Sequence, residues 1–256
     1  MLKIAVDAGH GLHTAGKRCP DDSMREFHFN SVVARYVAAG LAEYDDVETL
    51  FVHDPIGAAD IPLAGRVSAA NQAKASAYIS IHANAAGAGW NDAGGIETFV
   101  AVNASAKSVE LAKSVQQRLV AATKLRDRCG QAGVKRSDFY VIKHTAMPAI
   151  LVECGFMTNR AEAALLKSDS YRKTCAEAIV AGIAEVYGLK KKERKESKTT
   201  EVGTDAVTVI VNGKRIADGV LRDGRAYVPV RALGDALGMG VGWDAATKTA
   251  SLSGRQ

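Results

Sequence analysis

The sequence lacks any long apolar run. A membrane-spanning helix needs about 18 or more consecutive apolar residues, and the 256-residue chain contains no such stretch. The first residues, Met1-Leu-Lys-Ile, also lack the basic head and apolar segment of a secretory signal peptide. We therefore expect that the protein is made in the cytoplasm of the producing cell and does not insert into a membrane.

Cysteine is scarce and its spacing is uninformative for metal binding. The four cysteines show no CxxC pair, which favours reduced thiols in a chain without a secretion signal. Cys154 directly follows Glu153 and could be considered as a nucleophile. Neighbouring residues on a strand point to opposite faces, so if Glu153 faces a site, Cys154 faces the core.

An excess of positive charge on the folded domains is also lacking. The net charge of +5 is concentrated in residues 189–198, which carry +4, whereas residues 1–188 sum to zero and residues 199–256 to +1. Nucleic-acid-binding proteins carry clustered positive charge on a folded face. The basic segment instead predicts a solvated tether, and we expect no nucleic-acid partner.

Three strand-like segments, by contrast, each present a metal-ligand or acid–base residue at or just beyond the strand end. The β-branched runs beginning at Ile4, Tyr78 and Ile150 lead to His10, His82 and Glu153. Open α/β sheets place their active sites at the carboxyl ends of strands. Two imidazoles and a carboxylate delivered in this way predict a zinc hydrolase.

Four motifs in order over residues 1–188 resemble those of the zinc-dependent N-acetylmuramoyl-L-alanine amidases, the Amidase_3 family. They are Asp7-Ala-Gly-His-Gly11, Arg25-Glu-Phe-His-Phe-Asn30, Ser80-Ile-His-Ala-Asn84 and Leu151-Val-Glu-Cys-Gly-Phe-Met-Thr-Asn159. The resemblance implies cleavage of the amide between N-acetylmuramic acid and the L-alanine of the stem peptide in bacterial peptidoglycan. It also implies that His10, Glu26 and His82 hold Zn²⁺ and that Glu153 is the catalytic general base.

Further residues are candidates for supporting roles. Asn84 and Glu97 are placed to bind substrate or to order the site. Asp7 is a candidate acceptor that orients His10, because a zinc-bound imidazole usually donates its other N–H to an oxygen. Arg66 could pair with a nearby carboxylate or form an ordinary ion pair on a helix surface. Trp90 could stack on a sugar or cover the edge of the core.

The periodicity of residues 1–188 predicts a catalytic domain of alternating strands and helices. This pattern, together with the resemblance, favours an α/β three-layer sandwich with a mostly parallel twisted sheet. A long helix is expected over 23–44 and a strand over 139–142. A charged linker is expected over 189–204.

Residues 205–256 have a different pattern and predict a small α+β domain. Asn212-Gly213 between two β-branched runs predicts a hairpin. Val211-Asn-Gly-Lys214, Ala226-Tyr-Val-Pro-Val-Arg-Ala-Leu233, Leu237-Gly and Trp243-Asp resemble the amino-terminal domain of copper amine oxidases. The segment contains no histidine that could hold copper. We expect it to bind the cell wall or wall polymers, with a homodimer formed through this domain as the alternative.

Alternative functions remain open at this point. A zinc carboxypeptidase or endopeptidase on the same fold would cut a peptide bond of the stem, and a wall-adhesion protein would carry an inactive amidase domain. The chain combines these amidase motifs with the lack of an export signal. This combination is more typical of a phage endolysin, which acts on the wall after release, than of a bacterial autolysin.

Overall fold

The computed structural model describes residues 1–192, 206–222, 224–244 and 247–254. The chain divides into two compact units, Met1–Lys192 and Glu193–Gln256. The linker predicted over 189–204 lies outside the described residues from Glu193 onward. The start of the predicted linker, up to Lys192, belongs to the first unit, where Asp45 N donates to Lys190 O and Lys192 N donates to Glu43 O. None of the described helices has the length and apolarity needed to cross a membrane.

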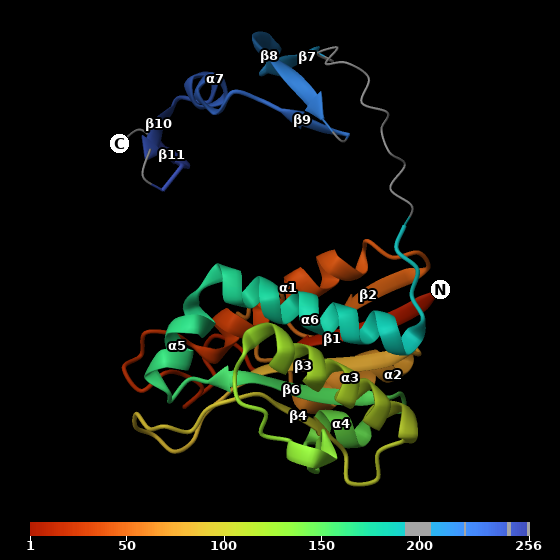
Figure 1. Cartoon of the computed structure of the whole chain (residues 1–256). Helices are drawn as coiled ribbons and strands as arrows, with labels where there is room; N and C mark the ends of the chain where they lie inside the picture. The colour runs from red at the N-terminus through yellow and green to blue at the C-terminus, as the bar shows by residue number, and fades with distance from the viewer. Residues whose placement is uncertain (193–205, 223, 245–246, 255–256) are drawn as a thin grey trace. The chain divides into compact units, whose positions relative to one another are not determined.

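A six-stranded sheet forms the centre of the first unit (Figure 1). Its strands are β1 (Leu2–Ala8), β2 (Val47–Phe51), β3 (Ala77–Asn84), β4 (Glu97–Val100), β5 (Lys135–Arg136) and β6 (Ala149–Phe156). The spatial order is β2-β1-β3-β6-β4-β5. All neighbouring pairs are parallel except β4 with β6, which confirms the predicted, mostly parallel sheet.

Helices cover both faces of this sheet. The helices are α1 (Glu26–Leu41), α2 (Leu63–Gln72), α3 (Ala106–Thr123), α4 (Tyr140–His144), α5 (Arg160–Lys167) and α6 (Asp169–Tyr187), with a short 3₁₀ turn η1 (Gly130–Ala132). Ile79 packs into the cluster with α1, α3 and α6, whereas its neighbour Tyr78 packs into the cluster with α2 and α4. Strand residues thus alternate between two apolar layers, and the three-layer α/β sandwich is confirmed.

Two local predictions differ from the structure. The segment predicted as a strand over 139–142 forms helix α4, which packs against α2 and buries Val141 and Ile142. A short apolar run of this kind fits a buried strand and a buried helix equally well by periodicity. The helix expected from Ser23 begins at Glu26, because residues 18 and 25 pair as an isolated bridge before it.

The described residues of the second unit form two small antiparallel sheets and one helix. Its elements are β7 (Ala206–Val211), β8 (Lys214–Arg222), β9 (Arg225–Tyr227), α7 (Val230–Ala236), β10 (Met239–Asp244) and β11 (Thr249–Gly254). Asn212 and Gly213 have φ values of 50° and 76°, as the two central residues of a type I′ turn require. The predicted hairpin and the small α+β unit are therefore confirmed.

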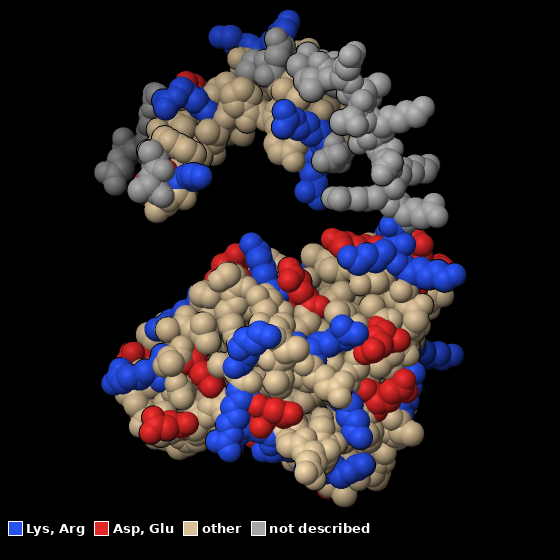
Figure 2. Space-filling view, viewed as in Figure 1, with Lys and Arg blue, Asp and Glu red and all other residues tan. Residues whose placement is uncertain are grey.

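Charged side chains of both signs are interspersed over the visible face of the first unit. Figure 2 shows lysine and arginine alternating with aspartate and glutamate across this face, without a continuous stripe of one sign. This distribution matches the zero net charge of residues 1–188 and is that of an ordinary solvated surface.

Candidate active site

The carboxyl ends of β1 and β3 bring His10 and His82 together. His10 follows β1 with φ +66°, in the left-handed region, and its ring lies 5.0 Å from that of His82 in an edge-to-face arrangement. Gly9 makes this approach possible, because a Cβ there would lie 2.0 Å from Cε1 of His82. The glycine preceding His10 is therefore required by the position of the second imidazole.

Glu26, the first residue of α1, completes a three-residue cluster with the histidines. Its Oε2 lies 3.3 Å from Nε2 of His10, and its Oε1 lies 2.9 Å from Nδ1 of His82. One candidate ligand atom from each residue can be chosen so that all three lie within 4.8 Å of one another. The three residues predicted to hold a metal are thus brought to one point.

The electrostatics of the cluster keep His10 and Glu26 in the protonation states in which they can bind a metal ion. Burial lowers the pKa of His10 to about 4, which keeps its imidazole neutral. Burial opposes ionisation of Glu26, but the hydrogen bond from His82 and the positive charge of that imidazole outweigh it and lower the pKa of Glu26. For His82, burial is outweighed by Glu26, and the pKa is raised. Metal binding would therefore displace a proton from His82.

Asn30 fixes the orientation of Glu26, and the sequence reasoning missed it. Its Nδ2 donates to Glu26 Oε1 at 3.2 Å and to Gly9 O at 3.0 Å. The backbone N–H of Ala83 donates to the same Glu26 oxygen at 3.2 Å. Asn30 lies one helical turn after Glu26, at the i,i+4 spacing that places two side chains on one face, and this spacing was the available signal.

Glu153 lies beside the cluster in the middle of the sheet. It is the register partner of His82 on β3 and of Glu97 on β4, so the three side chains form a row across strands about 4.8 Å apart. Its Oε2 is buried without a hydrogen-bond partner among the described residues. Burial raises the pKa of Glu153 to about 8, and the Glu26 and Glu97 carboxylates act in the same direction.

Asn84 and Glu97 contact each other at the other end of this row. Asn84 Nδ2 donates to Glu97 Oε2. The second oxygen of Glu97 pairs with Arg128 Nε at 2.8 Å and with Lys135 Nζ. These cations outweigh the burial of Glu97 and lower its pKa. The sequence reasoning did not identify Arg128 or Lys135, and no motif containing them marks the site.

The structure corrects the expected contact of Asp7 with His10. Both Asp7 oxygens are used elsewhere, one by Arg66 Nη1 at 2.6 Å and the other by Ser80 Oγ at 2.8 Å. Because Asp7 lies on β1 next to β3, its side chain meets the neighbouring strand residue Ser80 rather than the loop residue His10. Ser80 Oγ is in turn 3.1 Å from Nε2 of His82, so Asp7 is linked to the other histidine.

The remaining histidines lie outside the three-residue cluster, and Cys154 lies in the core as expected. His13 and His144 are exposed, and His28 is an exposed member of the capping box of α1. His53 is buried and accepts a hydrogen bond from the backbone of Ala8. Cys154 is fully buried in the core. Trp90 is half-buried against the core, with the guanidinium of Arg160 over its ring.

The three-residue cluster fits a zinc ion. Zinc takes histidine nitrogen and carboxylate oxygen ligands at about 2.0–2.2 Å, so atoms sharing one ion tetrahedrally lie a little over 3 Å apart. The 3.3 Å between His10 Nε2 and Glu26 Oε2 meets this requirement. Three candidate ligands lie beside Glu153, whose Oε2 is buried without a partner among the described residues, and this is the pattern of a catalytic metal site. The fold and the three candidate ligands together fit a metal-dependent hydrolase.

The chain belongs to the N-acetylmuramoyl-L-alanine amidase family, Amidase_3, whose model matches residues 4–185. Residues 189–252 match the model of the copper amine oxidase N-terminal domain. Both resemblances stated from the motifs are therefore confirmed.

Individual relatives agree with this assignment. The chain is 33% identical to the endolysin of Bacillus phage SPP1 over 222 residues, covering 82% of this chain and 77% of the endolysin. It is 40% identical to the N-acetylmuramoyl-L-alanine amidase LytC of Bacillus subtilis, covering 72% of this chain and 35% of LytC. The solved catalytic domain of the amidase CwlV from Bacillus (Paenibacillus) polymyxa superposes with a TM-score of 0.67 at 30% identity, covering 74% of this chain and all of that domain.

Proposed function

We propose that this chain hydrolyses the amide between N-acetylmuramic acid and the L-alanine of the peptidoglycan stem, with zinc held by His10, Glu26 and His82. The observation that carries the proposal is the convergence of these three ligands beside Glu153, whose buried oxygen has no partner among the described residues. Membership of the amidase family supports the choice of substrate.

The protein residues supply binding geometry and proton transfer. Zinc, when bound, supplies Lewis acidity that polarises the scissile carbonyl and acidifies water. Glu153 accepts the proton of the attacking water and returns it to the alanine nitrogen, because an amine leaves poorly without protonation. Burial and the neighbouring carboxylates of Glu26 and Glu97 raise the pKa of Glu153, which makes the ionised carboxylate a stronger proton acceptor. Asn84 and Glu97, held rigid by their mutual bond, are proposed to contact the substrate at the β4 side.

Analysis of the digestion products tests the reaction directly. Purified peptidoglycan treated with the protein should yield free stem peptides that begin with L-alanine, together with glycan whose muramic acid is intact, by mass spectrometry. A chelator added before the substrate should abolish both products, and added zinc should restore them. Release of stem fragments cut at an internal peptide bond would instead identify a peptidase.

The biological setting that we propose is release of the enzyme onto the bacterial wall, as for a phage endolysin. Similarity to the SPP1 endolysin over 222 residues supports this role. Similarity to LytC supports a bacterial autolysin as the second candidate.

The second unit is proposed to anchor the enzyme to wall polymers. Tyr227 and Trp243 are 54% and 62% exposed, and aromatic rings with an apolar face and a polar edge are suited to binding surfaces. A chain ending at Lys192 keeps the contacts of residues 190–192 with the first unit. It should cleave small soluble muramyl peptides at the full-length rate and act more slowly on intact walls, because tethering raises the local enzyme concentration.

Co-sedimentation of residues 193–256 with purified walls separates the two interpretations of this unit. Sedimentation with the wall supports the anchor. If this fragment stays in solution and the chain ending at Lys192 lyses walls at the full-length rate, the anchor is refuted. Light scattering of the full chain then tests the alternative, a homodimer formed through the second unit.

A further inference from the structure

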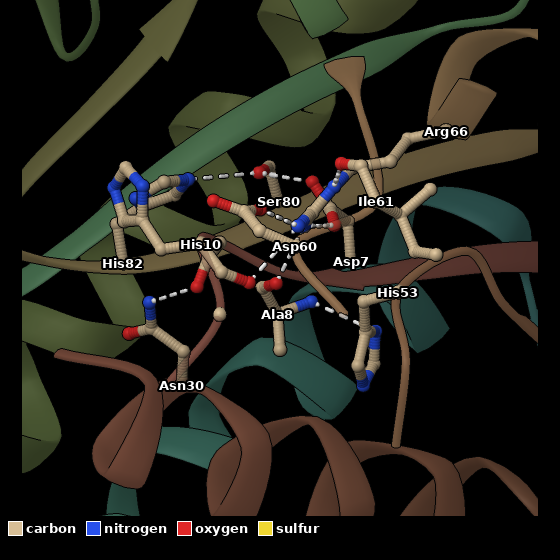
Figure 3. A network of polar contacts seen from close by, with 12 residues as sticks. Asp7, Ala8, His10, Asn30, His53, Asp60, Ile61, Arg66, Ser80 and His82 are labelled. Atoms are coloured by element: carbon tan, nitrogen blue, oxygen red, sulfur yellow. Dashed lines mark hydrogen bonds and ion pairs between the residues drawn. The ribbon is translucent and has the colours of Figure 1, made fainter. Parts of the chain in front are cut away.

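Arg66 of α2 is the most completely bonded charged side chain near the candidate site. It is 1% exposed, and all five of its N–H groups can be assigned an acceptor. The acceptors are Ile61 O at 2.8 Å, Asp7 Oδ1 at 2.6 Å, Ala8 O at 2.7 Å, His10 O at 2.9 Å and Asp60 Oδ1 at 2.9 Å. Figure 3 shows the guanidinium lying among these groups, on the far side of the β1 end from Asn30.

One set of these bonds fixes the turn that presents His10. Arg66 binds the carbonyls of Ala8 and His10, and Asn30 binds the intervening carbonyl of Gly9. Three successive carbonyls are therefore held by buried side chains. His10 has φ +66°, a conformation that is unfavourable for a residue with a Cβ and persists only when its surroundings enforce it. Arg66 supplies two of the three side-chain bonds to these carbonyls.

The bond from Arg66 to Asp7 connects Arg66 to His82 through two side chains, those of Asp7 and Ser80. Arg66 holds one oxygen of Asp7, and the other oxygen accepts the hydroxyl proton of Ser80. With its proton directed at Asp7, Ser80 Oγ can only accept from Nε2 of His82, 3.1 Å away. The chain of bonds therefore places a proton on Nε2. It leaves Nδ1, which faces Glu26, as the nitrogen available to a metal.

We propose that Arg66 is a positioning residue that sets the geometry of both histidine ligands, His10 through its backbone and His82 through Asp7 and Ser80. The inference rests on the proposed function, because it takes these histidines as ligands. Lysine cannot replace Arg66, since its single ammonium has three donors and no planar fork to span backbone and carboxylates. Partners that orient metal ligands in this way typically contribute about 10- to 100-fold to metal affinity.

The test measures zinc affinity of the full-length protein by competition with a chromophoric chelator, alongside circular dichroism and thermal unfolding. Arg66→Lys should fold and bind zinc about 10- to 100-fold more weakly than the unmodified protein. Its cobalt-loaded form should show altered visible bands, which report ligand geometry directly. Arg118→Lys is the matched control: Arg118 lies on α3 in an ion pair with Glu185, and its replacement should change neither measurement.

Two further variants decide the case if Arg66→Lys does not fold. Ser80→Ala removes only the link between Asp7 and His82 and should weaken zinc binding about 10-fold. Arg66→Gly should recover affinity when guanidinium is added at millimolar concentration. The positioning role alone would be overturned if Arg66→Lys folded and kept its zinc affinity and cobalt bands. If Arg66→Lys does not fold, it would be overturned by unchanged affinity and cobalt bands in Ser80→Ala together with no guanidinium rescue of Arg66→Gly. Failure of the unmodified protein to bind zinc would overturn the proposed function and this inference together.

Discussion

Glu153→Gln should lower turnover on purified peptidoglycan by about 10²-fold or more while leaving the fold and the zinc content unchanged. The substitution keeps the shape of the side chain and removes its ability to accept a proton. Glu153 is the register partner of His82 and has one buried oxygen without a partner among the described residues. Steady-state kinetics, elemental analysis and circular dichroism on the same preparation provide the three readouts.

Cys154→Ser is the control for this experiment. Cys154 is the next residue on β6, but it is buried in the core on the opposite face of the strand, so its replacement should change stability rather than chemistry. A Glu153→Gln protein with wild-type turnover would show that Glu153 is structural and that another group transfers the proton. Loss of zinc in this variant would show instead that Glu153 takes part in metal binding.

The sequence predicted the convergence of the site because strand ends are easy to identify. His10 and His82 follow β-branched runs, and parallel strands deliver their carboxyl ends to one edge of the sheet. The row of His82, Glu153 and Glu97 follows from strand pairing. It can be predicted once β3, β6 and β4 are known to be neighbours in the sheet. The motifs in the sequence identified His82 and Glu153, whereas the pairing register of the strands sets how these side chains are arranged.

The supporting contacts could not be predicted because they depend on which segments pack together. The sequence left open whether Arg66 pairs with a nearby carboxylate or forms an ion pair on a helix surface. Its burial beside Val67 and Ala70 and its partners up to 59 positions away follow only from packing. Asp7 was assigned to the wrong histidine for the same reason: its neighbour across the sheet is Ser80. Periodicity likewise could not distinguish helix α4 from a short buried strand.

His82→Ala should reduce zinc from about one ion per chain to a small fraction of that value and lower turnover on the order of 10³-fold. Catalytic zinc sites in proteins use three protein ligands, and this change leaves two. The lost Lewis acidity contributes several kcal/mol to the transition state, at about tenfold in rate per 1.36 kcal/mol. The change also removes the nitrogen that lies 2.9 Å from Glu26.

His13→Ala is the matched control, because His13 lies three residues after His10 and is exposed. Elemental analysis should find its zinc content equal to that of the unmodified protein. Undiminished zinc in a folded His82→Ala chain would refute the ligand assignment, whatever its activity. Diminished zinc in both variants would extend the metal site to His13. Zinc lost only from His82→Ala is the result expected if Glu26 and the two histidines at the ends of β1 and β3 hold the ion.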